Sequence, residues 1–229
     1  MALDRFLQLM LYSLRDIVFG IEDSAITTLG VVIGVVSSGS STHEILLAGA
    51  AAVIGGLISM TTGEYISTKS QVEVLQGEVS EEREKLRRRP EHELRGLERC
   101  YERHGFKKGE ARLVVREFSH HKKLLLRTLL AEELGILPER FENPIRNATI
   151  MGIAYIIGGL LPLTPFVFLS RETALPFSVA LSVAALFIVG AWKTTVTKRP
   201  WLRSGLEMLF IGLLAAAAGY AFGILYPGA

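Results

Sequence analysis

The chain reads ILLAGAAAVIGGLISMTTGEYI from Ile45 to Ile66 and continues with STKSQVEVLQGEVSEEREKLRRR from Ser67 to Arg89. The first stretch is long and apolar enough to cross the roughly 30 Å hydrocarbon core of a bilayer as a helix. The second stretch is rich in Glu, Lys and Arg, which favour helix in water. Because only Gly77 interrupts the pattern, we expect one helix to continue from the membrane into solvent.

Four further stretches resemble the apolar one. With it they give five candidate spans, at roughly Ile17–Val36, Ile45–Ile66, Asn147–Leu169, Ala174–Val196 and Gly205–Tyr226. The mean hydropathy of the whole chain is also positive, at +0.35. The sequence therefore predicts an all-α membrane protein with five transmembrane helices in a lipid bilayer. Pro162 and Pro165, late in the third span, predict a kink or an end there.

The link between the second and third spans differs sharply in composition from the spans. From Ser70 to Arg146 it holds 17 Lys and Arg and 15 Glu, a near balance that does not indicate nucleic-acid binding. Pro90 and the turn-like stretch His104–Gly109 divide this link into about three helices. We expect three regions: residues 1–66 with two spans, a helical domain at 67–146, and residues 147–229 with three spans.

Basic residues predict the orientation in the membrane. Of the 25 Lys and Arg, only Arg171 lies in the links between the first and second and between the third and fourth spans. The positive-inside rule therefore places the N-terminus and the charged domain in the cytoplasm and the C-terminus outside.

Polar and small residues recur along one face of the first span. They follow steps of three and four, as on one helical stripe: Asp16, Gly20, Asp23, Thr27, Gly30, Gly34 and Ser37. A carboxylate at the centre of a span costs roughly 2.5–3.5 kcal/mol on insertion scales, and it is tolerated where it meets water or a cation. The stripe fits one wall of a cation path. The alternative is a small-residue packing seam, with Asp23 neutral or paired to a lysine.

Asp23 and Met60 are predicted to lie at one depth. Each is six residues from the cytoplasmic end of its span, or roughly 9 Å into the membrane. A carboxylate beside a thioether favours late transition metals over Mg²⁺ or Ca²⁺. Glu22 neighbours Asp23, and Glu64, one turn from Met60, is either an entry ligand or a carboxylate that reaches the headgroups.

Two ridges of small residues predict close helix packing, within or between subunits. One lies on the second span at Ala51, Gly55, Ser59 and Gly63, and the other on the fifth span at Ala215, Gly219 and Gly223.

The charged domain carries one weak catalytic pattern. Glu117 and His120 have the E-x-x-H spacing that paired helices use to hold two iron ions, and Glu132 and Glu133 follow later. This leaves open a membrane-anchored di-iron enzyme, or a metal sensor whose spans only anchor it. No phosphate-binding loop is present, so uphill transport requires an ion gradient.

Motifs from the first span to the third resemble those of one family. They are RDIVFG at 15–20 before Asp23-Ser24, ISM at 58–60 with GEY at 63–65, EELG at 132–135, and AYIIGGL at 154–160. In this order the chain is similar to the vacuolar iron transporter family, related to the yeast Ca²⁺-sensitivity cross-complementing transporters. The similarity covers nearly the whole chain.

This resemblance implies a homodimer, not an enzyme, that moves Fe²⁺ and often Mn²⁺ out of the cytosol against protons. No permanently bound cofactor is implied. The metal path would lie between the two first spans, with Asp23 as transport carboxylate and Met60 as pore methionine. The charged domain would bind metal through Glu82, Glu93 and Glu133. The membrane would be the cell membrane in a prokaryote, or a vacuolar or other organelle membrane in a eukaryote.

Three positions depart from the family pattern. Ala52 stands where the family commonly has a glutamate, Lys85 replaces a further domain glutamate, and Leu129-Leu130 replace a methionine pair. The domain is therefore expected to bind metal more weakly, in a different arrangement, or with preference for a harder cation. In the expected mechanism Asp23 binds metal when ionised and releases it when protonated. Glu22 and Glu64 share the proton traffic, and Thr27 lines the path.

Overall fold

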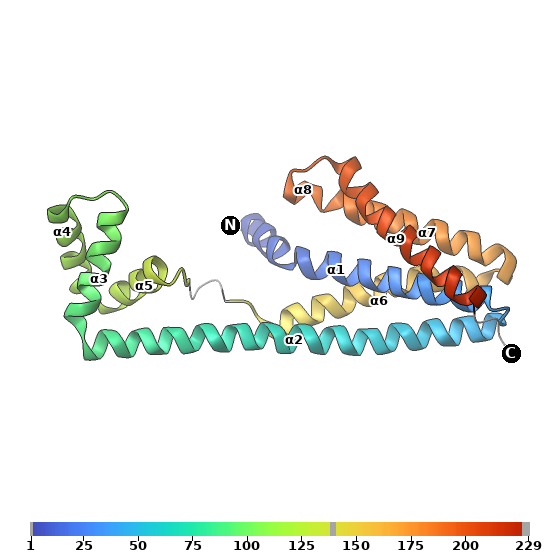
Figure 1. The fold of residues 1–229 in the computed structure, drawn as a ribbon, viewed down its shortest axis with the longest axis horizontal. Coiled ribbons are helices and arrows are strands. Elements are labelled where there is room, and N and C mark those ends of the chain that lie inside the picture. The colour runs from blue at the N-terminus through green and yellow to red at the C-terminus, as the bar shows by residue number, and fades with distance from the viewer. Residues whose placement is uncertain (1, 138–140, 226–229) are drawn as a thin grey trace. The chain divides into compact units, whose positions relative to one another are not determined.

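The computed structural model describes residues 2–137 and 141–225, with side chains from Ser13 onward. Helices are the only regular secondary structure in these ranges (Figure 1). In chain order they are α1 (Ala2–Ser37), α2 (Thr42–Arg88), α3 (Pro90–Arg103), α4 (Lys108–Ser119), α5 (Lys122–Glu133), α6 (Pro144–Phe168), α7 (Arg171–Trp192), α8 (Thr194–Thr197) and α9 (Trp201–Leu225).

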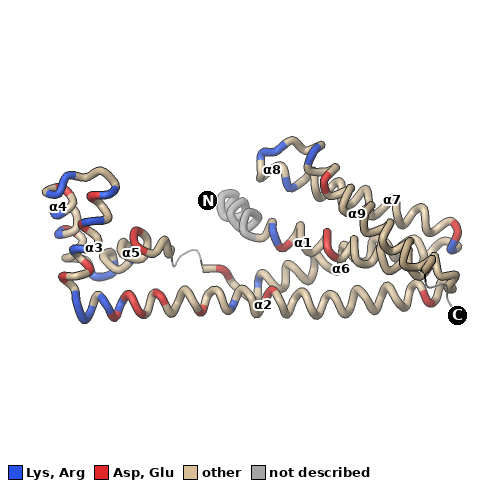
Figure 2. Tube along the Cα trace, viewed as in Figure 1, with Lys and Arg blue, Asp and Glu red and all other residues tan. Residues whose placement is uncertain are grey.

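Five of these helices are long and apolar enough to cross a membrane: α1, α2, α6, α7 and α9. The five spans expected from the sequence are thus confirmed as five long apolar helices. Lys, Arg, Asp and Glu gather on the charged end of α2, on α3 and α4, and around α8, while the middle parts of α6, α7 and α9 are nearly free of them (Figure 2). The chain is a multi-pass membrane protein.

Contacts divide the chain into two compact units. One contains the described residues up to Ile66 and those from Pro144 onward, and the other runs from Ser67 to Asn143. α2 is a single helix of 47 residues that contributes to both units, and Gly77 does not interrupt it.

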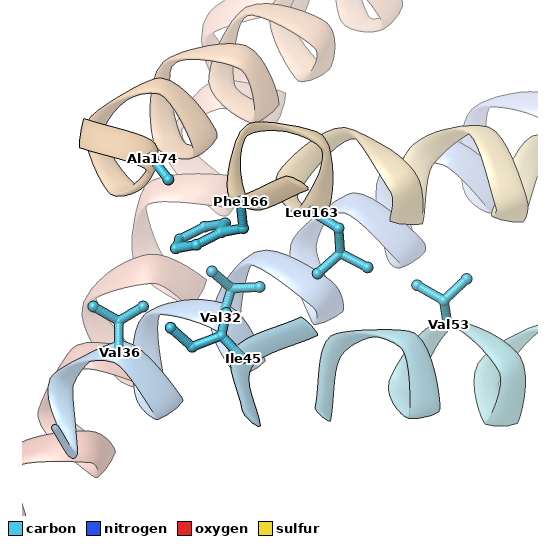
Figure 3. Close-up of a cluster of buried hydrophobic side chains, with 7 residues drawn as sticks. All are labelled: Val32, Val36, Ile45, Val53, Leu163, Phe166 and Ala174. Atoms are coloured by element: carbon cyan, nitrogen blue, oxygen red, sulfur yellow. The ribbon is translucent and has the colours of Figure 1, made fainter. Parts of the chain in front are cut away.

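The core of the first unit is assembled from four helices (Figure 3). Its buried side chains come from α1, α2, α6 and α7, and they are Val32, Val36, Ile45, Val53, Leu163, Phe166 and Ala174. A second cluster joins Ala25 of α1 to Leu186 of α7 and Met208 of α9. α1 therefore packs among the other spans, and these contacts determine which neighbour each face of α1 meets.

Glycines allow α1 to approach α9 closely. A Cβ on Gly219 of α9 would overlap the carbonyl oxygen of Gly30, and one on Gly223 would overlap that of Gly34. Of the two ridges expected from the sequence, the one on α9 thus packs within the chain. On another face of α1, Gly158 of α6 leaves room for the Ser24 hydroxyl.

The prolines of α6 and the side chain of Arg171 both bear on how the spans end. α6 continues through Pro162 and Pro165 as far as Phe168, so neither proline ends the helix at its own position. Arg171 donates hydrogen bonds to the carbonyl oxygens of Val36, Gly39 and Ser40 at 2.9–3.0 Å. The guanidinium thus satisfies carbonyls at the C-terminal end of α1.

The second unit packs α3, α4 and α5 together. Its core consists of Leu97, Val115, Leu125 and Leu129, with Leu86 from the end of α2 packed against them. Breaks occur at Arg89 and at 104–107, near the expected places. A further break, at His120–His121, was not expected. α4 ends at Ser119, and His120 caps it with helical backbone angles.

Candidate metal sites

The polar stripe of α1 is divided between two environments. Gly30 and Gly34 face the backbone of α9, so the C-terminal half of the stripe is a packing seam. Asp23 is half-buried and Thr27, one turn later, is exposed. Among the residues that the structure describes, none forms a hydrogen bond or ion pair with Asp23. An open carboxylate therefore remains on the N-terminal side of this packing seam.

Two ionisable side chains lie near Asp23. Glu22 is half-buried, and Lys193 at the end of α7 attracts its charge. Tyr155 of α6 is 2% exposed and lies within electrostatic range of Asp23. Its hydroxyl occupies the space beside Gly56 of α2, where a Cβ would overlap it. The sequence alone assigned no role to Tyr155, and its place in the AYIIGGL motif was the only indication that it matters.

Met60 and Glu64 lie on α2. Met60 is half-buried, and its position at the depth of Asp23 stays a prediction. Glu64 accepts a 2.7 Å hydrogen bond from Arg15 of α1, whose Nε also lies 3.3 Å from Asp16. Glu64 is therefore an ion-pair partner that links α1 to α2, and binding of a metal there would compete with Arg15.

Three glutamates from three different helices meet in the second unit. Carboxylate oxygens of Glu82 on α2, Glu93 on α3 and Glu133 on α5 lie within 4.8 Å of one another. Glu82 is 2% exposed, and its Oε1 has no hydrogen-bond partner. Gly96 makes room for the Glu133 carboxylate, because a Cβ there would lie 2.6 Å from Oε1. A buried carboxylate oxygen without a partner is what a bound cation would satisfy.

The negative charges of the three glutamates repel one another, and a bound cation would relieve this repulsion. Burial raises the pKa of Glu82 above its ordinary value of 4.5, and the charge of Glu93 raises it further. Burial and Glu93 likewise raise the pKa of Glu133, although Arg103 and Arg99 oppose this effect. A divalent ion would reverse both shifts, since it stabilises the ionised carboxylates.

The positions that depart from the family pattern have structural roles here. The Nζ atom of Lys85 lies 3.6 Å from Glu82 Oε2 and 3.1 Å from Glu81 Oε1. Lys85 thus supplies positive charge beside the glutamate cluster. Leu129 and Leu130 are almost completely buried, and Leu129 belongs to the core of this unit. Ala52 is half-buried on α2.

The E-x-x-H pair does not join a group of metal ligands. Glu117 and His120 are both exposed. Two groups of three potential ligands occur within the described ranges: the glutamate cluster, and Cys100 with His104 and Glu132. The second group was missed by the sequence reasoning. The i, i+4 spacing of Cys100 and His104 was its only local signal, and Glu132 comes from another helix.

Known proteins are similar to the chain over most of its length. Residues 14–224 match the model of the VIT family. The chain is 31% identical to "Vacuolar iron transporter 1" of Eucalyptus grandis over 90% of its length and 83% of that protein. It is 30% identical to "Vacuolar iron transporter 1" of Arabidopsis thaliana over the same shares. It is 29% identical to "Vacuolar iron transporter" of Toxoplasma gondii over 92% of this chain and 73% of that protein. The chain therefore belongs to the VIT family.

Proposed function

We propose that this protein carries Fe²⁺ or Mn²⁺ out of the cytosol in exchange for protons. Its relatives are named as iron transporters, which assigns the chain to transport and not to catalysis. The observation that carries the proposal is Asp23, a half-buried carboxylate on a membrane-spanning helix without an ion-pair partner among the described residues. A carboxylate in a membrane is costly unless it meets water, a partner group or a cation, so its presence indicates a path for ions or protons.

The proposed mechanism alternates the occupant of one carboxylate. Ionised Asp23 binds the metal, with Met60 supplying a thioether that favours transition metals over Mg²⁺. Protonation of Asp23 then releases the metal, and Glu22 passes protons to and from the same region. Thr27, exposed one turn from Asp23, continues the polar face. Tyr155 lies within electrostatic range of the Asp23 carboxylate.

The glutamate cluster is proposed to collect metal on the cytoplasmic side. The distribution of basic residues supports a cytoplasmic N-terminus and a cytoplasmic second unit. All three ligands offer oxygen, which suits Mn²⁺ and Fe²⁺ as well as harder ions. The positive charge of Lys85 beside Glu82 reduces the affinity of this cluster.

We also propose that the protein forms a homodimer. The ridge of Ala51, Gly55, Ser59 and Gly63 on α2 is exposed, and none of the described residues from other elements lies within 4 Å of a Cβ placed on Gly55 or Gly63. Small residues permit close helix approach in a membrane, so this ridge suits a second copy of α2.

The test is metal flux into liposomes that contain the purified protein and a metal-sensitive dye. We expect Fe²⁺ and Mn²⁺ flux that rises with an imposed pH gradient. Asp23→Asn should lower it at least about a hundredfold, since it removes the charge that binds the metal. Glu207→Gln, an exposed carboxylate paired with Arg203, is the matched control and should transport normally.

Either of two outcomes would contradict the mechanism. Asp23→Asn with the wild-type rate and pH dependence would exclude Asp23 as the exchanging group. Flux that ignores the pH gradient would exclude proton coupling.

A further inference from the structure

A thiol, an imidazole and a carboxylate meet at one end of the second unit. Ligand atoms of Cys100, His104 and Glu132 all lie within 4.8 Å of one another. Cys100 is 3% exposed, and it is the single cysteine of the chain. His104 is exposed and Glu132 half-buried, so the group is open to solvent from one side.

Local structure holds each of these side chains in place. Cys100 lies in the last turn of α3 and His104 caps that helix, so the two are four residues apart on one face. The backbone N–H of His104 donates to the carbonyl of Cys100 at 3.1 Å. The ring of Tyr101 meets the imidazole edge to face, with centroids 6.3 Å apart. The Cys100 thiol donates to the backbone carbonyl of Glu132 at 3.6 Å, which directs sulfur toward the end of α5.

The distance between the imidazole and the carboxylate fits a small tetrahedral ion. His104 Nδ1 lies 3.5 Å from Glu132 Oε2, which is long for a hydrogen bond. Two ligands on tetrahedral Zn²⁺, each about 2.0–2.3 Å from the metal, are separated by roughly 3.3–3.7 Å. The imidazole and carboxylate are thus already spaced as ligands of one ion.

The group is separate from the glutamate cluster. Cys100 follows Glu93 by seven residues on α3, which is about 10 Å along the helix axis. Its donor atoms also differ, because sulfur and imidazole nitrogen prefer borderline and soft metals, whereas three carboxylates suit harder ones.

We propose that Cys100, His104 and Glu132 form a second metal site that binds a divalent ion of the Zn²⁺ class. The fourth position of the ion is open to water. Binding releases the thiol proton and exchanges the hydrogen bond to the Glu132 carbonyl for a metal–sulfur bond. The site depends on residues of the second unit alone and does not require that the protein transports metal.

The experiment titrates Co²⁺, as a spectroscopic substitute for Zn²⁺, into the purified full-length protein in detergent with a reductant that contains no thiol. We expect a near-ultraviolet band from thiolate-to-cobalt charge transfer, which Zn²⁺ then removes. Cys100→Ser should abolish the band. His104→Gln should weaken Co²⁺ binding at least about tenfold. His43→Gln, an exposed histidine at the start of α2, is the matched control and should bind normally.

A second variant separates the two sites. Glu82→Gln alters the glutamate cluster and should leave the charge-transfer band intact. The proposal is wrong if wild type gives no such band, if the band survives Cys100→Ser, or if Glu82→Gln removes it.

A readout that needs no change at Cys100 covers the case in which Cys100→Ser fails to fold. Zn²⁺ should slow alkylation of the single thiol at least about tenfold in wild type, but much less in His104→Gln. Equal protection in both proteins would overturn the proposal.

Discussion

Glu82 illustrates, at the residue scale, how a buried charge links stability to pH. Burial and the neighbouring Glu93 raise its pKa above the ordinary value of 4.5. The folded protein without metal therefore disfavours the ionised form, compared with the unfolded chain. The contribution of Glu82 to stability is complete below about pH 4.5 and is lost as the pH rises through the raised pKa.

From this we expect Glu82→Gln to stabilise the second unit without metal at pH 7 and to change little at pH 4. The amide keeps the shape of the side chain but removes the charge that burial disfavours. Hydrogen–deuterium exchange of α3, compared between the two proteins at each pH, measures the effect. Equal protection at pH 7 would contradict it. With Mn²⁺ present, α3 of the wild type should be better protected than α3 of Glu82→Gln, because only the wild type has all three carboxylates.

At the scale of elements, the glycines of the long helices differ in what surrounds them. Gly219 of α9 lies against the backbone of Gly30, and a Cβ there would overlap that carbonyl. Around Gly77 of α2, no described residue from another element lies within 4 Å of where a Cβ would be. The same substitution is therefore expected to act in opposite directions at these two positions.

Gly219→Ala should lower the thermal stability of the detergent-solubilised protein, because α1 and α9 must separate to accommodate the methyl group. Gly77→Ala should stabilise the helix by about 0.5–1 kcal/mol, because alanine lowers the entropy lost on helix formation. Thermal unfolding in one detergent measures both variants. A Gly219→Ala protein as stable as wild type would exclude close α1–α9 packing.

At the scale of the whole molecule, the open ridge on α2 predicts the interface of the proposed homodimer. Gly55→Leu should weaken the proposed dimer at least about tenfold and leave the protomer folded, because no residue in the described part of the chain occupies the space beside Gly55. Ile188→Leu, at an exposed position of α7, is the control. Sedimentation in detergent measures the dimer fraction. An unchanged fraction would show that the ridge is not the interface, and a monomeric wild type would overturn the dimer itself.

The sequence by itself determined the class of the molecule and most of its helices. Runs of about 20 apolar residues fix the spans, because a bilayer leaves the backbone no hydrogen-bond partners other than its own. The charged continuation from Ile66 to Arg89 likewise predicted the long α2. These features depend on neighbours in the chain, and therefore composition and spacing are sufficient to find them.

Only the tertiary structure decided which side chains meet. The stripe on α1 looked uniform, but α9 covers Gly30 and Gly34 and leaves Thr27 exposed. The E-x-x-H spacing suggested a ligand pair, but Glu117 and His120 belong to neither group of three potential ligands among the described residues. Cys100 and Glu132 are 32 residues apart and meet because α5 folds back onto α3. Contacts between helices depend on how whole faces pack, and the spacing of residues along one helix carries no information about its partner.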